Sequence, residues 1–158
     1  MLAVRPSIVY RSLGQAEADF FAEYLRLCDK EFPTLPQWPG LAWNNGYVDW
    51  AHTNWRVRFG HRSLKPFTVS RIFALHAPPT PWIEAVLHEI AHAACFIIGP
   101  HDPPGNDHGP HWKHYAILCG TPARARQPDS SFMPERRRKA NAKITQKPTS
   151  QNSDRSSN

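Results

Sequence analysis

Two histidines and a glutamate lie inside the most apolar stretch of the chain, WIEAVLHEIAHAACFIIG. His88 and His92 are four residues apart, so on a helix their side chains project from one face, one turn from each other. This spacing lets both imidazoles reach one metal ion at about 2.0–2.1 Å, while Glu89 reaches a metal-bound water. Two partly buried imidazoles without a metal ion would be costly to desolvate. The stretch therefore predicts a zinc site with Glu89 as its acid–base group.

A catalytic zinc ion usually takes three protein ligands and leaves one position for water, so a third ligand is needed. The extended metzincin pattern would place glycine at position 95 and histidine at position 98, and this chain has Cys95 and Ile98 there. A glutamate on a following helix is poorly supported, because the first one after Glu89 is Glu135. The remaining candidates are His101, Asp102, Asp107, His108, His111 and His114. His108 stands out among them because it precedes the start of a predicted helix.

The segment HEIAHA, followed after a loop by DHGPHWKHYAILCG, closely resembles the SprT-like (Spartan-related) zinc metalloproteases. Their signature is HExxH, a variable loop, and a His-Gly pair that opens a helix with an aromatic residue three positions after the glycine. The resemblance implies that His88, His92 and His108 bind zinc and that Glu89 is the catalytic glutamate. It is specific over residues 80–120.

Three further residues of this motif are expected beside the metal, in contact with its ligands or with substrate: Gly109, His111 and Trp112. Gly109 and Trp112 match the glycine and aromatic positions of the family. His111 stands where a glutamate is common in the relatives, so we expect a different polarity around the site. The zinc-ribbon segment of many relatives cannot be built here, because no cysteine follows Cys119. Any DNA binding must then come from the basic tail or be absent.

The helices that must hold this site can be read from hydrophobic periodicity and capping residues. A capping-box pattern at Ser12 and apolar residues at helical spacing predict a helix over 13–31. Thr80 is a candidate cap for a second helix over 81–98, which carries the HExxH motif. Proline and glycine bound a short third helix over 110–120.

The segment between Tyr47 and His76 is rich in β-branched and aromatic residues with rough alternation. It predicts two or three antiparallel strands, and the strand near 67–76 is predicted to be an edge that pairs with an extended peptide substrate. Together these elements predict an α+β fold of the zincin, SprT-like type. In it, a small antiparallel sheet packs on the metal-binding HExxH helix and flanking helices.

The positive charge of the chain is concentrated in its last quarter. Residues 1–120 hold ten Lys/Arg and ten Asp/Glu, whereas residues 121–158 hold nine and three. The last segment is also poor in apolar residues, which predicts a metalloprotease domain over 1–122 and a disordered basic tail over 123–158. The tail is either simply solvated or makes sequence-independent, salt-sensitive contacts with nucleic acid. The residues assigned to such contacts are Arg136, Arg137, Arg138 and Lys139.

Four tryptophans precede or enter the predicted sheet, and two interpretations fit them. With Arg56 and Arg58 they could form a platform on which bases stack. The favoured alternative is that they fill the core of a small sheet domain. These tryptophans are Trp38, Trp43, Trp50 and Trp55.

Three scattered cysteines, Cys28, Cys95 and Cys119, do not form a disulfide framework, which indicates a reducing compartment. The N-terminal segment lacks the apolar region and cleavage site of a signal peptide. The longest apolar run, near 90–98, is interrupted by His92 and is too short to cross a bilayer. We therefore expect a soluble, cytoplasmic protein with no membrane partner, associated with the nucleoid where the tail contacts DNA.

The residues favour a zinc metalloendopeptidase whose partner is a protein or peptide substrate. The resemblance implies proteins attached to DNA as substrates, as in the repair of DNA–protein crosslinks. Two other classes also fit: a zinc-containing module that binds DNA or protein without significant peptidase activity, and a metal-dependent hydrolase of a non-peptide amide. Glu89 favours the enzyme, because a purely structural zinc normally has four protein ligands.

Overall fold

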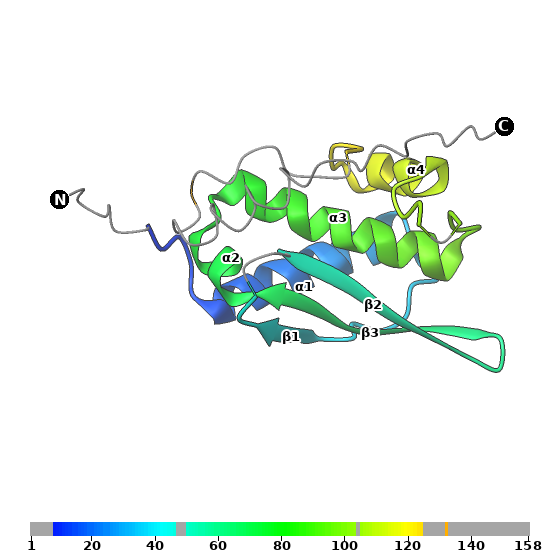
Figure 1. The fold of residues 1–158 in the computed structure, drawn as a ribbon, viewed down its shortest axis with the longest axis horizontal. Helices are drawn as coiled ribbons and strands as arrows, with labels where there is room; N and C mark the ends of the chain where they lie inside the picture. Colours follow the sequence, from blue (N-terminus) through cyan, green and yellow to red (C-terminus); the bar gives the residue numbers. More distant parts are fainter. Residues whose placement is uncertain (1–7, 47–49, 104, 125–131, 133–158) are drawn as a thin grey trace, which may run out of the picture.

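The computed structural model describes residues 8–46, 50–103, 105–124 and 132, and it has an α+β fold (Figure 1). A three-stranded sheet and two long helices form the body. In chain order the elements are α1 (Leu13–Lys30), β1 (Leu41–Asn44), β2 (Ala51–Arg58), β3 (His61–Ser70), α2 (Arg71–His76), α3 (Pro79–Ile98) and α4 (Pro110–Cys119).

The three predicted helices form close to their predicted bounds. Ser12 caps α1, because its hydroxyl accepts a 3.0 Å hydrogen bond from the backbone N–H of Gln15. α3 begins two residues earlier than predicted, and Pro78 rather than Thr80 is its N-cap residue. α4 ends at Cys119, and its C-cap residue Gly120 has a φ of 79°, a left-handed conformation that glycine adopts without steric cost.

The antiparallel strands predicted between Tyr47 and His76 are confirmed as β2 and β3, but the sheet as a whole is mixed rather than antiparallel. Its strand order is β1-β3-β2, in which β1 is parallel to β3 and β2 is antiparallel to β3. β1 lies in the Pro- and Trp-rich segment before Tyr47, where the sequence pattern predicts a loop. A strand of only four residues is too short to show a clear alternation, and its pairing with β3 depends on contacts distant in the sequence.

The predicted edge strand near 67–76 is also wrong. Residues 67–70 end the central strand β3, where Val69 pairs with Trp43 on one side and Ala51 on the other. The remaining residues form α2, because the hydroxyl of Ser70 accepts a hydrogen bond from the N–H of Phe73 and caps the helix. Among the described strands, the edges of the sheet therefore belong to β1 and β2.

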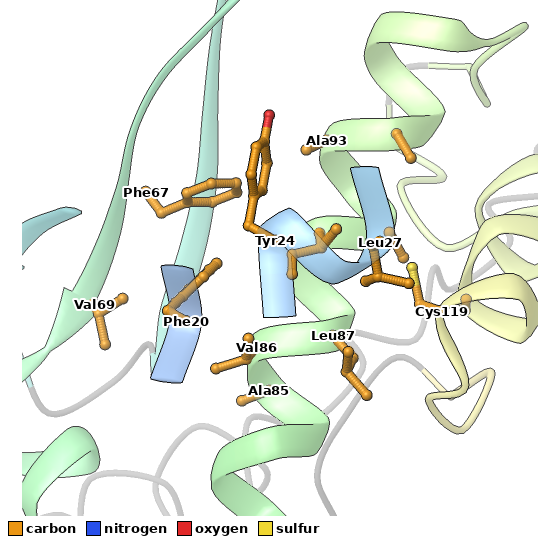
Figure 2. Close-up of a cluster of buried hydrophobic side chains, with 14 of the residues drawn as sticks. Phe20, Tyr24, Leu27, Phe67, Val69, Ala85, Val86, Leu87, Ala93 and Cys119 are labelled. Carbon is orange, nitrogen blue, oxygen red and sulfur yellow. The ribbon is translucent and has the colours of Figure 1, made fainter. Parts of the chain in front are cut away.

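The hydrophobic core lies between the sheet and the helices, and Figure 2 shows part of it. Side chains from α1, β3, α3 and α4 meet there, so the helix that carries the HExxH motif is fixed from several directions. The labelled core residues are Phe20, Tyr24, Leu27, Phe67, Val69, Ala85, Val86, Leu87, Ala93 and Cys119. Phe132, beyond the predicted domain boundary at 122, also packs against this core through Trp50 and Phe73, with ring centroids 5.8 and 6.1 Å apart.

Contrary to the expectation from the apolar run near 90–98, the 20-residue helix α3 is long and apolar enough to cross a membrane by length and composition alone. However, 61% of its most apolar window is buried inside the fold, and Ile90, Ala91 and Ala94 are fully buried. The core helix of a globular protein has the same composition, so α3 is interpreted as a core helix.

The tryptophans divide into two groups. Trp38, Trp43 and Trp50 are partly buried and pack against the core, as the favoured interpretation predicted. Trp55 is 42% exposed and lies on β2, where its ring stacks on Phe96 of α3 with centroids 4.6 Å apart. Trp55 therefore belongs to the surface rather than to the core.

Candidate metal centre

Three histidine side chains converge between the middle of α3 and the start of α4. His88 and His92 project from successive turns of α3, and His108 lies two residues before α4 begins. Their Nε2 atoms are 3.2 Å apart for His88 and His92, 3.1 Å for His92 and His108, and 3.0 Å for His88 and His108. Of all the candidates for a third ligand, His108 is the one that joins this cluster.

The cluster fits a metal ion. Zinc binds imidazole nitrogen at about 2.0–2.1 Å in tetrahedral sites, which places neighbouring ligand nitrogens about 3.3 Å apart. The observed separations of 3.0–3.2 Å are close to this value for all three pairs. Three nitrogen atoms that face one common point, with no carboxylate among them, match a three-histidine zinc site that leaves a fourth position open.

Trp112 forms one wall of this cluster. It is fully buried, and its ring lies against all three histidines, with centroids 4.7 Å from His88, 5.3 Å from His92 and 4.6 Å from His108. An indole in this position restricts the rotation of the imidazoles and excludes water from one side. The structure therefore places Trp112 next to the proposed ligands.

Asp102 fixes the start of α4 and does not join the histidine cluster. Its carboxylate is 8% exposed and accepts hydrogen bonds from the backbone N–H of His111 at 3.2 Å and of Trp112 at 2.8 Å. These are first-turn amides of α4, which have no partner within the helix and attract a negative charge. A Cβ atom on Gly109 would overlap this carboxylate, so glycine is needed for the close approach.

Glu89 projects from the same helix but is held by the sheet. The Thr53 hydroxyl on β2 lies 2.7 Å from the Glu89 carboxylate oxygen Oε2 and 2.7 Å from its backbone carbonyl oxygen. Burial raises the pKa of Glu89 to about 7, although the Thr53 hydrogen bond and the charge of His52 act in the opposite direction. A carboxylate with this pKa can both accept and release a proton near neutral pH.

The pKa values of the three histidines favour the neutral form that binds a metal cation. Burial lowers the pKa of His88 to about 4, and the charge of His108 adds to this effect. Burial also lowers the pKa of His92, further than that of His88, and that of His108. The imidazoles are therefore neutral at physiological pH, which is the form that donates a lone pair to a metal.

The other candidate residues do not join the cluster. His101 stacks on Phe96, and its Nδ1 lies 3.1 Å from the backbone carbonyl of Asp102. Asp107, His111 and His114 are exposed. The backbone N–H of His111 donates a hydrogen bond to the Asp102 carboxylate. The predicted nucleic-acid cluster of Arg136, Arg137, Arg138 and Lys139 lies outside the described residues.

Two contributors to the site were not predicted in their actual roles. Thr53 lies 36 residues before Glu89, and nothing local in the sequence links the two. Asp102 was considered as a metal ligand. Its carboxylate instead accepts hydrogen bonds from the N–H groups of His111 and Trp112, nine and ten residues later in the sequence. The one sequence signal was Gly109, a glycine just before a helix where another backbone or side chain can approach closely.

Comparison with known proteins gives a family assignment for the chain. Searches of curated proteins and of solved structures found no match. The model of the SprT-like family matches residues 40–132, a range that includes the whole sheet, α3, α4 and the three clustered histidines. Because this range is more than half of the 158-residue chain, the protein belongs to the SprT-like family.

Proposed function

We propose that this protein is a zinc-dependent peptidase in which His88, His92 and His108 hold the metal and Glu89 is the catalytic acid–base. The main support is that the imidazoles and the carboxylate occupy separate positions at the site. Three imidazoles form the cluster, and a buried carboxylate beside His88 is held outside it by Thr53. A structural zinc site would normally use a fourth protein ligand instead.

Zinc bound by the three histidines would polarise a carbonyl group and lower the pKa of a bound water. Glu89 supplies the proton transfers: its carboxylate takes a proton from the attacking water and returns it to the leaving amine. The Thr53 hydroxyl orients this carboxylate, and the pKa of about 7 suits both halves of the cycle near neutral pH. Trp112 keeps bulk water away from the imidazoles on one side.

The substrate is proposed to bind along β2 rather than along the segment first predicted. Among the described strands β2 pairs only with β3, so its other edge offers backbone N–H and C=O groups to an extended peptide. Thr53 belongs to this strand and touches Glu89, so a peptide paired there would run past the acid–base group. Recognition through the backbone would accept many sequences.

The physiological substrates are proposed to be DNA-associated proteins inside the cell, as in the repair of DNA–protein crosslinks. The support is membership of the family together with the basic tail, where Arg136, Arg137, Arg138 and Lys139 would contact DNA through non-specific charge interactions. This assignment of substrates rests on the proposed peptidase activity.

The test compares wild type with Glu89→Gln on casein and histone, with and without single-stranded DNA. We expect the variant to retain its zinc and to lose activity about 10²–10⁴-fold, because the proton acceptor is gone. Glu84→Gln is the matched control: it lies on the same helix but forms a surface ion pair with Arg124, so it should cleave as wild type does. A zinc-loaded wild type that cleaves neither protein under any condition would favour a binding module instead.

A further inference from the structure

The hairpin of β2 and β3 has an unusual charge distribution. No Asp or Glu occurs between Trp50 and Ile83, whereas five of the ten cationic residues in 1–120 do. Four of these five lie on the hairpin itself, at Arg56, Arg58, Arg62 and Lys65. In the described part of the chain, none of the four forms an ion pair with a carboxylate. The hairpin therefore presents uncompensated positive charge.

The strand register separates this charge into two faces. Residues paired across an antiparallel ladder share a face, so Trp55, Val57 and Arg62 lie on the face toward α3. Trp55 stacks on Phe96 there, and Arg62 donates a 2.9 Å hydrogen bond to the Phe96 carbonyl. The opposite face is entirely polar from end to end. Its residues are Asn54, Arg56, Arg58, His61, Ser63 and Lys65.

The tip of the hairpin carries an aromatic ring in an unfavourable backbone conformation. Arg58 pairs with His61, so Phe59 and Gly60 form a two-residue turn with φ values of 49° and 78°. Such a turn favours Asn-Gly, and a bulky residue at its first position is strained. The Phe59 side chain is nevertheless 89% exposed, and the Arg58 guanidinium lies 5.3 Å from its ring centroid. Apart from this contact with Arg58, the ring is open to solvent.

The hairpin also extends away from the body. In Figure 1 the β2–β3 turn lies beyond the ends of α3 and β1, with no other labelled element beside it. We call residues 54–65 the cationic arm. An extended strand rises about 3.3 Å per residue, so the tip lies about 20 Å along β2 from Thr53 at the catalytic carboxylate.

We propose that the cationic arm binds single-stranded nucleic acid, with phosphates against Arg56, Arg58 and Lys65 and a base stacked on Phe59. Positive charge that follows a strand, combined with an exposed ring, is the combination that holds unpaired nucleotides. The wholly polar outer face does not fit the apolar interior of a membrane. An acidic peptide would be attracted by the charge but has no base to stack on Phe59. The arm is separate from the metal centre, so this proposal does not depend on peptidase activity.

The experiment measures binding of the full chain to a fluorescent oligothymidylate over a range of salt concentrations. The arm variant replaces Arg56, Arg58 and Lys65 with glutamine. Its matched control replaces Arg26, Lys30 and Lys113 with glutamine, which removes the same charge from the surface of the body and leaves the tail intact. Loss of three phosphate contacts should reduce the slope of log affinity against log salt by about 2, whereas the control should keep the wild-type slope.

A substitution at the tip tests the stacking contact without damage to the hairpin. Phe59→Asn creates the favoured Asn-Gly turn, so the melting temperature should stay the same or rise. Affinity for the oligothymidylate should nevertheless fall about fivefold or more, because one stacked base is lost.

Four results would overturn the proposal. They are an arm variant that binds as wild type does, an equal loss in the arm and control variants, full affinity in Phe59→Asn, and preferential binding of duplex DNA, polyglutamate or anionic lipid vesicles over the single strand.

Discussion

Replacing Asp102 with alanine should loosen the start of α4 and weaken metal binding, although Asp102 is not a proposed ligand. The carboxylate accepts two first-turn amides of α4, at 3.2 and 2.8 Å, and one of them belongs to the fully buried Trp112. A hydrogen bond to a charged group contributes about 1.5–3 kcal/mol, and loss of a helix cap costs about 0.5–2 kcal/mol. We expect a total loss of about 2–3 kcal/mol in the free energy of unfolding.

For a domain of this size, each kcal/mol lowers Tm by about 4 °C, so Asp102→Ala should melt about 8–12 °C below wild type. His108 lies in the loop that this carboxylate anchors, so zinc affinity should fall about 10–100-fold, as is typical for groups that position a ligand. Asp102→Asn keeps one acceptor oxygen and should recover part of both losses. Calorimetry of the metal-free protein and competition with a zinc indicator measure the two effects.

The control is Asp107→Ala, which removes an exposed carboxylate from the same loop. It should change the free energy of unfolding by no more than about 0.5 kcal/mol. The reasoning is refuted if Asp102→Ala melts with wild type, or if it binds zinc as tightly as wild type does.

Three further predictions concern Gly109, Thr53 and the core residue Cys119. Gly109→Ala should lower both Tm and zinc affinity, as Asp102→Ala does, because the new Cβ atom would displace the Asp102 carboxylate. Wild-type zinc affinity in Gly109→Ala would contradict the close approach of Asp102 to residue 109. Thr53→Val removes a hydrogen bond that lowers the pKa of Glu89, so the acid limb of the pH dependence of kcat/KM should move to higher pH; a shift to lower pH would contradict the assignment of Glu89 as base. Burial raises the pKa of Cys119 to about 12, so this thiol should resist iodoacetamide at pH 8 until the protein is unfolded. Because the folded protein favours the neutral thiol, its contribution to stability is complete below about pH 9 and is lost as the pH rises toward 12. Rapid labelling of the native protein would show that the side chain is not buried.

The parts of the fold that local sequence determines were predicted well. Capping at Ser12, the proline at 110 and the glycine at 120 bound helices that form where these signals lie. His88 and His92 were identified because their spacing of four residues has a direct meaning on a helix. His108 was assigned through family resemblance, and its Nε2 does join theirs.

The parts that depend on contacts distant in the sequence were missed. β1 is stabilised by parallel pairing with β3, and the ladder from Leu41 to Phe67 has no local signature. The sequence from 67 to 76 continues β-branched and aromatic, yet the Ser70 cap ends the strand and begins a helix. Thr53 and Asp102 act on residues that only the folded chain brings near them.

The most direct test of the account is the amount of zinc bound per chain in His108→Ala, measured by elemental analysis after dialysis. Wild type should retain one zinc ion per chain, and His108→Ala should lose most of it under the same conditions. His111→Ala, which removes an exposed imidazole from the first turn of α4, should retain zinc as wild type does. Full zinc retention in His108→Ala, or loss of zinc in His111→Ala, would contradict the three-histidine centre.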